Sequence, residues 1–382
     1  MKKIISVLII CIIIIGVVGC SRLNENSDDD NKYSSVDYKI GIITGSLLQG
    51  EEEFLMAENM KSKYGEMILH LTYPDNFATE QETVVAQVVE LANDPTIKAI
   101  IFVRAIPGTL EAIEKVRLLR EDMLIIVGCV DEDARSVASI ADICMDVDEI
   151  NMGNTIVEQA DNMGAKTLVH YSFERHLSYD IIAQRRDKLK ENCEKLGLEF
   201  VEVSTPDPIE HLSDNMLQQF IHKDVAYQVA KYGTDTAFFA TDCSMQEQLI
   251  TSLIDQKAIF PQQCCPSVYH AYPDVLDIDT TMHETDYSWV LQEVATRVGQ
   301  VGMSGRMASW AVPIKMLMIE GGVEYAIKYC EAKTDVKYHP IIFEDTLSNV
   351  VGDSYGITYN KYEDSYDRID NFYLLSVDYY MF

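Results

Sequence analysis

Apolar residues along the chain recur in short continuous runs, and longer segments with helical spacing of apolar and polar positions separate them. The runs in the first part of the chain are KIGIITG (39–45), MILHLTY (67–73), IKAIIFV (97–103), MLIIVGC (123–129) and ICMDVD (143–148). Continuous aliphatic residues, in place of strict alternation, are typical of parallel strands covered on both faces. We therefore expect a parallel strand in each run.

The segments between the runs are amphipathic. In residues 79–94, Val84, Val88 and Ala92 fall on one helical face, and Leu110, Ile113 and Val116 repeat this spacing in the next segment. Strands that alternate with such helices form βαβ units, which build a doubly wound sheet.

The same alternation continues after Asp148, with strands expected at 165–171, 198–204 and 236–241. Domains commonly contain about 100–150 residues, so this length fits two sheets better than one. We predict an α/β fold of two doubly wound parallel-sheet lobes joined by a hinge, the first closing near Asp148 and Glu149. The carboxyl ends of the strands should converge on a cleft between the lobes.

The amino-terminal sequence MKKIISVLIICIIIIGVVGC combines two lysines, a short apolar run and a small residue before Cys20. This is typical of a lipoprotein signal peptide over 1–19, with Cys20 acylated after cleavage. The alternative is an uncleaved membrane anchor. Residues 20–37 are almost free of apolar side chains and predict a disordered tether. We expect the protein outside the cytoplasm, held on the membrane by its lipid.

Charge and cysteine content exclude two classes of protein. The 61 acidic and 31 basic residues give a net charge of −30, which disfavours any nucleic acid partner. Apart from Cys11 and Cys20, the cysteines show no framework spacing, so no disulfide scaffold is expected. Adjacent Cys264 and Cys265 are interpreted as one buried and one exposed small residue, with a vicinal disulfide or a soft metal contact as alternatives.

The order of elements resembles a type I periplasmic binding protein, the fold shared with the effector domains of LacI-type repressors. The resemblance covers about 38–275 and is carried by MLIIVGCVDEDARSVASIADICMDVDEINMGN and TDTAFFATDCSMQEQLITSLIDQ. Within this superfamily, GIITGSLLQGEEEF, TYPDNFATEQET and VHYSFERHLS resemble an uncharacterised family of bacterial lipoproteins. A repressor would begin with a helix-turn-helix, which this sequence lacks at its start.

The resemblance implies that the chain returns to the first lobe and then crosses again. It assigns residues 38–149 and about 279–345 to the amino-terminal lobe. It assigns about 150–278 and 346–382 to the carboxy-terminal lobe.

Several polar residues follow the predicted strands of the first lobe and are candidates for ligand binding. They are Ser46, Gln49, Tyr73, Asp75, Asn76, Arg104 and Asp131. Each has an ordinary alternative as a turn or capping residue.

The second lobe offers the stretch VHYSFERHLS (169–178) at the end of its first strand. Tyr171 and Phe173 present flat faces for stacking, and Arg175 presents a planar fork for an anion. The superfamily implies that one arginine of the pair Arg185 and Arg186 reaches the ligand, and that Asp242 contacts it. Tyr269 is a weaker candidate.

Catalytic motifs such as GxSxG and HExxH are absent from the sequence. A metal site built from His170, Glu174 and His176 lacks a regular geometry, so we predict no metal and no cofactor. The expected function is capture of a small polar ligand, such as a nucleoside, sugar or amino-acid derivative, for an ABC importer. The alternatives are ligand sensing for a membrane receptor, an envelope hydrolase using Ser172 and His176, and a structural lipoprotein without a ligand.

Overall fold

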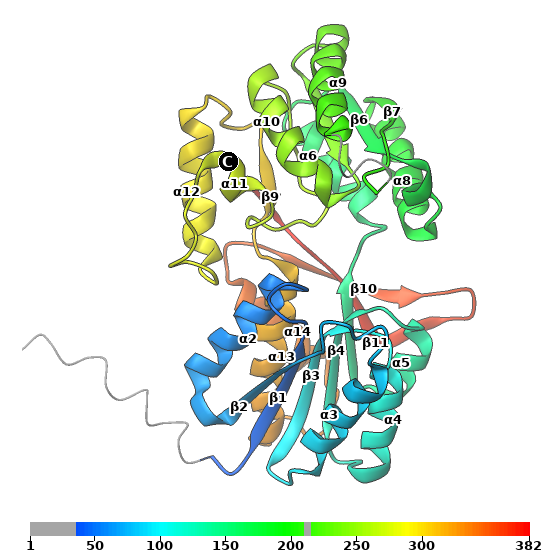
Figure 1. Cartoon of the computed structure of the whole chain (residues 1–382), viewed down its shortest axis with the longest axis vertical. Helices are drawn as coiled ribbons and strands as arrows, with labels where there is room; N and C mark the ends of the chain where they lie inside the picture. Colours follow the sequence, from blue (N-terminus) through cyan, green and yellow to red (C-terminus); the bar gives the residue numbers. More distant parts are fainter. Residues whose placement is uncertain (1–35, 210–214) are drawn as a thin grey trace, which may run out of the picture.

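Two α/β lobes form the molecule, as Figure 1 shows, in a computed structural model that describes residues 36–209 and 215–382. The predicted signal peptide, the Cys20 lipidation site and nearly all of the predicted tether lie outside the described residues. We call residues 36–148 and 311–378 the first lobe, and residues 149–209, 215–310 and 379–382 the second lobe. The two-lobed α/β architecture with parallel sheets agrees with the prediction.

The first lobe contains a seven-stranded sheet in the order β10-β11-β5-β4-β3-β1-β2 within the described residues. Its strands are β1 (Lys39–Thr44), β2 (Ile68–Thr72), β3 (Ile97–Ala105), β4 (Leu124–Val130), β5 (Ile143–Val147), β10 (Ile357–Glu363) and β11 (Arg368–Val377). All neighbours pair in parallel except β10, which runs antiparallel to β11 at one edge. Of the runs predicted as strands, β1, β3, β4 and β5 therefore lie inside this sheet, and β2 forms one of its edges.

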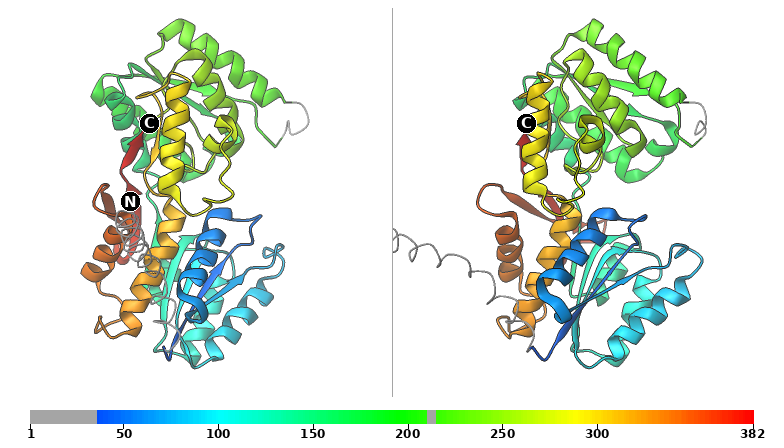
Figure 2. Two further views of the ribbon diagram at one scale, coloured as in Figure 1. Left: turned by 90° about the vertical axis from the view of Figure 1, so that its left-hand side faces the viewer. Right: turned by 60° about the vertical axis from the view of Figure 1, so that its left-hand side comes forward.

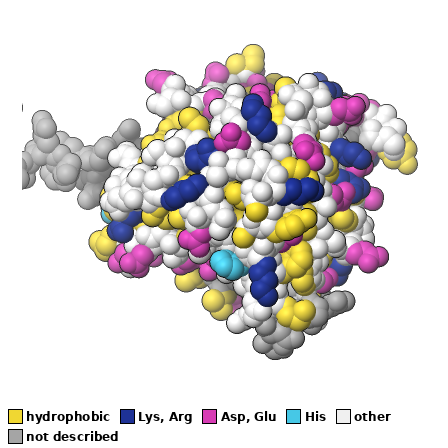
Figure 3. Space-filling model, turned by 90° about the horizontal axis from the view of Figure 1, so that it is seen from above, with side chains coloured by type: hydrophobic (Ala, Val, Ile, Leu, Met, Phe, Trp, Pro, Cys, Tyr) yellow, Lys and Arg dark blue, Asp and Glu magenta, His cyan; other side chains and the backbone are white. Residues whose placement is uncertain are grey.

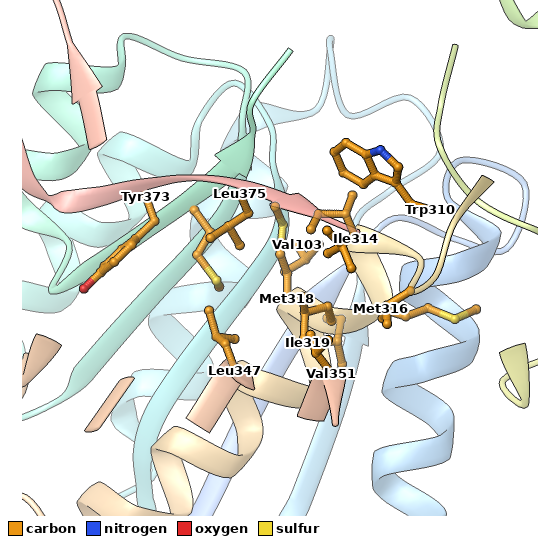
Figure 4. Close-up of a cluster of buried hydrophobic side chains, with 14 of the residues drawn as sticks. Val103, Trp310, Ile314, Met316, Met318, Ile319, Leu347, Val351, Tyr373 and Leu375 are labelled. Carbon is orange, nitrogen blue, oxygen red and sulfur yellow. The ribbon is translucent and has the colours of Figure 1, made fainter. Parts of the chain in front are cut away.

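Helices cover both faces of the first sheet. They are α2 (Glu51–Tyr64), α3 (Gln81–Asn93), α4 (Thr109–Leu119), α5 (Ala134–Ile140), α13 (Ile314–Cys330) and α14 (Pro340–Val351), with a 3-10 turn η1 (Gly65–Met67). Ile42 and Ile101 pack with α2, α13 and α14, whereas Ile43 and Phe102 pack with α3, α4 and α5. Figure 4 shows Met318 and Ile319 of α13 between the sheet and Leu347 of α14. Covering on both faces explains why the strands are continuously apolar.

The second lobe has a three-stranded parallel sheet in the order β7-β6-β8. Its elements are α6 (Met152–Asn162), β6 (Thr167–Ser172), α7 (Glu174–Leu177), α8 (Asp180–Leu196), β7 (Glu199–Ser204), α9 (Met216–Tyr232), β8 (Thr236–Ala240), η2 (Cys243–Met245), α10 (Gln246–Gln256), α11 (Tyr272–Leu276) and α12 (Tyr287–Gln300). Leu168 and Phe239 pack with α6 and α8, while Val169 and Phe238 pack with α9 and α10.

Within the described residues the chain passes between the lobes after β5, after β9 (Ala308–Trp310) and after β11. The strand β12 (Tyr379–Met381) then pairs antiparallel with β9. The crossings lie side by side, because Asp148 N donates to Leu375 O at 3.0 Å and Ala311 N donates to Asp378 O at 2.9 Å. Together these segments form the hinge, which is seen from two further directions in Figure 2.

Two predicted lobe assignments are wrong. Strands β10 and β11, expected in the carboxy-terminal lobe, extend the first sheet beyond β5, because Phe372 and Tyr373 of β11 bury themselves on opposite faces of that sheet. Helix α12, expected in the amino-terminal lobe, packs on the second lobe through Val290, Leu291 and Val294. Of residues 346–382, only residues 379–382, which include β12, belong to the second lobe.

Charged side chains of both signs intermingle over the end of the second lobe that lies far from the hinge, as Figure 3 shows. Among residues 36–209 and 215–382, no helix combines the length and the apolar character that crossing a membrane requires.

Candidate functional site

A cavity of ≈ 710 Å³ lies between the lobes. The first lobe contributes Arg104 at the end of β3, residues 129–134 at the end of β4, and Asp146 in β5. The second lobe contributes residues 149–150, Met152, Ile181 and the loop 264–267. This cavity is the cleft that the carboxyl ends of parallel strands predict.

A smaller cavity of ≈ 370 Å³ adjoins the cleft. It lies between residues 51–53 at the start of α2 and Tyr269, His270 and Pro273 of the second lobe. Glu52, Cys265 and Lys315 line both cavities.

The lobes contact each other beside these cavities. The Glu52 side chain hydrogen-bonds Ser267 across the cleft. Asn59 of α2 donates to the Thr285 hydroxyl of the second lobe at 2.9 Å. These polar contacts break when the lobes separate, so the structure is a form in which the lobes are together.

Carboxylates dominate the polar groups of the cleft, and several of them already have structural partners. Glu132 accepts bonds from the N–H groups of Gly108 and Leu110 at the start of α4, at 3.0 and 2.7 Å. Asp133 caps α5 by accepting from Ser136 N at 2.8 Å. These two groups hold loops in place, and their bonds leave less capacity for a ligand.

The remaining charged groups of the cleft face its interior more freely. Arg104 Nε lies 2.5 Å from Asp131 Oδ2, and both side chains are partly exposed. Lys315, the second residue of α13, pairs with Glu53 at 3.4 Å. An ammonium, a guanidinium and several carboxylates in one cavity can donate to and accept from a ligand rich in hydroxyl or amine groups.

Burial changes the protonation of two cleft carboxyls. It raises the pKa of Asp146 to about 7, against the opposing hydrogen bonds from Val147 N and Val130 N. It also raises the pKa of Glu52, although the bond to Ser267 and the charge of Lys315 oppose the shift. Perturbed carboxyls of this kind concentrate at binding sites.

Of the candidates in the first lobe, the structure places Arg104 and Asp131 on the cleft. Ser46 Oγ instead donates to Asp75 Oδ1 at 2.8 Å, and Gln49 Nε2 donates to Asp75 O at 2.9 Å. These three residues therefore fasten one loop to another and line neither cavity.

Two further candidates of the first lobe are also away from the cavities. Tyr73 is buried at 2% exposure in the core of the face that α3 and α4 cover. Asn76 is exposed in a turn, where its carbonyl accepts from Thr79.

The stacking residues predicted at 169–178 do not face the cleft. Tyr171 is fully buried and donates its hydroxyl to Asp224 Oδ2 at 2.8 Å. Phe173 is buried against the His176 ring, with centroids 5.0 Å apart. The prediction that Tyr171 and Phe173 stack on a ligand is corrected, because both side chains lie on the side of β6 that packs with α9 and α10.

The three arginines predicted in the second lobe have protein partners. Arg175 forms a bidentate pair with Asp207, with both N···O distances 2.8 Å. Arg186 pairs with Glu202 at 2.7 Å and with Asp187. Neither lines the cavities, so the prediction for these two is corrected.

Arg185 is the arginine of the pair that turns inward. It is 3% exposed, lies over the Phe239 ring at 5.4 Å and reaches Glu149, a cleft residue, at 3.4 Å. It therefore positions a cleft carboxylate and does not itself line the cavity.

Asp242 and Tyr269 complete the candidates. Asp242 caps η2 by accepting from Ser244 N at 3.0 Å and lines neither cavity. Tyr269 lines the smaller cavity and donates its hydroxyl to His283 O at 2.7 Å.

The pair expected for a hydrolase is not assembled. Ser172 is buried, and its Oγ accepts a bond from the Thr241 hydroxyl at 3.1 Å. His176 Nδ1 also bonds Thr241, at 2.9 Å, so Thr241 lies between them. A nucleophile needs a base in direct contact, and this arrangement does not provide one.

Sequence reasoning missed Glu52, Asp146, Glu149 and Lys315 as cleft residues. Signals for two of them existed, because Glu52 lies in the first turn of the helix after β1 and Asp146 precedes the predicted hinge. Lys315 is an isolated cation in the apolar segment AVPIKMLMI. The sequence alone does not distinguish a lysine in a buried site from a lysine on the surface, and the fold is needed to place Lys315 in the cleft.

The chain is also similar in sequence to known proteins. A family model described as "Protein of unknown function (DUF3798)" matches residues 38–308. An uncharacterised protein of Treponema pallidum (strain Nichols) is 37% identical over 164 residues, which is 43% of this chain and 76% of that protein.

Solved structures share the fold. A protein from Clostridium difficile 630, described as a proposed transcriptional regulator, has a TM-score of 0.83 at 24% identity and covers 91% of this chain and 99% of its own. A sugar ABC transporter from Actinomyces odontolyticus has a TM-score of 0.51 at 8% identity, over 79% of this chain and 86% of its own. At these identities the likeness concerns the fold alone.

Proposed function

We propose that this chain, which belongs to the DUF3798 family, is a solute-binding protein that captures a small polar ligand between its two lobes. The observation that carries the proposal is the cavity of ≈ 710 Å³ lined by charged side chains from both lobes. This volume lies within the ~300–1,000 Å³ of small-molecule sites. The shared fold with a sugar ABC transporter supports the same reading.

The charges of the cleft favour one kind of ligand. The carboxyl groups of Glu52, Asp131, Asp146 and Glu149 outnumber the basic groups of Arg104 and Lys315, although burial raises the pKa of Glu52 and Asp146 and so favours their neutral forms. A second anion would be repelled, whereas hydroxyl and ammonium groups find acceptors. A sugar, nucleoside or amino-acid derivative with free hydroxyl or amine groups fits better than a phosphate ester.

The mechanism is closure around this ligand. Contacts from both lobes stabilise the closed form relative to the open one, and only that difference shifts the equilibrium. A membrane partner then recognises the closed form. We take this partner to be the permease of an ABC importer, with a signalling receptor as the alternative.

The proposal includes a lipid anchor at Cys20 on the outer face of the membrane. Labelling cells with a fatty acid probe tests it, since the parent protein should be labelled and a Cys20→Ala variant should be released without label. Photo-crosslinking in cells then distinguishes a permease from a receptor as the membrane partner.

The decisive experiment compares Arg104 with Arg175, both of which the sequence predicts to bind the ligand. Small molecules released by denaturing the purified protein are identified by mass spectrometry and returned in a melting assay. A ligand at 100 times its dissociation constant stabilises by about 2.7 kcal/mol. Arg104→Ala should abolish most of this shift, and Arg175→Ala should retain it. Equal shifts in both variants would remove Arg104 and the cleft from the proposal.

A further inference from the structure

Three cysteines and a histidine of the second lobe converge beside the cleft. Cys243 Sγ lies 3.4 Å from Cys264 Sγ and 3.6 Å from Cys265 Sγ, and the last two sulfurs are 3.9 Å apart. His270 Nε2 lies 3.6 Å from Cys264 Sγ. The ligand atoms of Cys243, Cys264 and His270 all fall within 4.8 Å of one another.

The three sulfur–sulfur separations and the separation of His270 from Cys264 lie near the edges of a tetrahedral metal site. With Zn–S bonds of about 2.3 Å and Zn–N bonds of about 2.0–2.1 Å, tetrahedral angles place sulfurs about 3.8 Å apart and sulfur and nitrogen about 3.6 Å apart. Three sulfur ligands and one imidazole form a known structural zinc donor set. Soft thiolates also disfavour Mg²⁺ and Ca²⁺, which prefer oxygen.

We propose that Cys243, Cys264, Cys265 and His270 bind one Zn²⁺ ion at the rim of the interlobe cleft. Each thiol that binds releases its proton to solvent, and the imidazole binds in its neutral form. All four of these ligands are side chains of the chain itself, whichever solute occupies the cleft.

The surrounding chain holds the ligands ready. Asp242 fixes the turn that carries Cys243, because its carboxylate accepts from both the N–H and the hydroxyl of Ser244. Gln263 is fully buried, and its Nε2 donates to Ser267 O at 2.8 Å and to His270 O at 3.1 Å. These bonds set the loop from Cys264 to His270 without using any of the four ligand atoms.

The position of the site connects it to the movement of the lobes. Cys264 and Cys265 line the cleft, and Cys265 and His270 line the smaller cavity. Ser267, in the same loop, bonds Glu52 of the first lobe. An ion that fixes this loop therefore also fixes one partner of an interlobe contact.

The experiment is a metal titration of the purified protein after chemical reduction. Zn²⁺ competition with a chromophoric chelator should give one tight site per chain. Co²⁺ should produce the thiolate charge-transfer absorption and the visible bands of a tetrahedral complex. Excess Mg²⁺ or Ca²⁺ should displace neither ion, which separates this site from the cleft carboxylates.

The main variants are Cys243→Ser and Cys265→Ser, because both side chains are exposed and the substitution should preserve folding. Loss of either ligand should weaken Zn²⁺ by more than the ~10–100-fold typical of an outer-shell change. Cys330→Ser, on a thiol outside the cluster, should bind like the parent. Melting curves without metal confirm that each variant folds.

Absence of tight binding in the reduced parent would overturn the proposal. So would cysteine variants that bind Zn²⁺ and Co²⁺ as the parent does. Loss of the Co²⁺ charge-transfer band in both variants, with Cys330→Ser unchanged, would support it.

Discussion

The protonation state of His170 is set by the side chains that surround it. It is fully buried in β6, with Phe200 and Phe239 stacked on its two sides at centroid distances of 6.0 and 6.1 Å. Neither ring nitrogen has a hydrogen-bond partner among the described residues. Burial, with the charge of Arg185 adding to it, lowers the pKa of His170 to about 3, so the ring is neutral in the folded protein.

The low pKa predicts acid sensitivity. The imidazole of His170 takes up its proton near pH 6.5 in the unfolded chain and only near pH 3 in the folded protein. The stability that the neutral ring contributes is therefore fully present above pH 6.5 and is lost as the pH falls from 6.5 to 3. The loss from pH 7 to 5 should be about 2 kcal/mol. Burial raises the pKa of Asp146 and Glu52, which adds stability over the same interval, so the loss due to His170 is measured as a difference between two proteins. Denaturant unfolding at both pH values should show that, between pH 7 and 5, the parent loses about 2 kcal/mol relative to His170→Phe.

A control removes an imidazole that is exposed. His222→Gln should keep the acid dependence of the parent. An identical pH profile in His170→Phe and the parent would show that His170 is not responsible.

Individual residues also limit what a sequence reveals about the site. The rule that ligands bind at the carboxyl ends of parallel strands identifies Arg104 and Asp131. It succeeds there because the end of each strand is visible in the sequence as a change from apolar to polar residues. It fails at Tyr171 and Phe173, because in a strand buried on both faces the sequence does not tell which side chains face the core. Cys243 meets Cys264 and His270 only through tertiary folding, because it precedes Cys264 by 21 residues.

At the scale of elements, α13 is held between the first sheet and α14 by a close approach. A Cβ on Gly321 would lie 2.2 Å from Leu347 Cδ2, and Leu347 is fully buried. The helix backbone can approach α14 only because position 321 has no side chain.

This approach reverses the usual effect of a glycine substitution. Alanine in a helix interior is ordinarily favoured over glycine by about 1 kcal/mol. Here Gly321→Ala should instead destabilise by about 1–3 kcal/mol through overpacking. Chemical unfolding measures the change.

A second substitution tests the cause. Adding Leu347→Ala opens the space, so the double variant should be more stable than the sum of the two single effects predicts. Additive effects would place the cost of Gly321→Ala elsewhere.

Elements also explain the errors in lobe assignment. The apolar runs identify β1, β3 and β4 directly, since each is a buried parallel strand. The alternation in SYDRIDNFYLLSVDYYMF correctly indicates strand but does not name the partner, and β11 pairs with β5 across more than two hundred residues of sequence. Partner choice depends on which sheet edge is free after the lobes have formed.

At the scale of the molecule, acidic charge opposes closure. The net charge is −30, and closing the lobes brings Asp131 and Glu149 to one cavity, together with Glu52 and Asp146, whose pKa values burial raises. Salt screens such repulsion, with a Debye length of about 30 Å at 0.01 M and about 8 Å at 0.15 M.

Salt should therefore favour the compact form of the ligand-free protein. Raising NaCl from about 0.01 to 0.15 M should lower the radius of gyration in X-ray scattering and raise the melting temperature. Glu149→Gln should reduce the change in radius, and Glu114→Gln, a substitution outside the cleft, should not. A radius that is independent of salt would contradict a charge-limited closure.

The polarity of the first sheet has a further consequence. The parallel strands of the first sheet start at the pole of the lobe that lies away from the cleft, and β1, which begins with Lys39, starts there too, as Figure 1 shows. A tether joined just upstream of Lys39 would thus hold the first lobe at the pole that lies away from the cleft. A fluorophore or bead fused at that pole would therefore report on ligand capture without blocking the cleft.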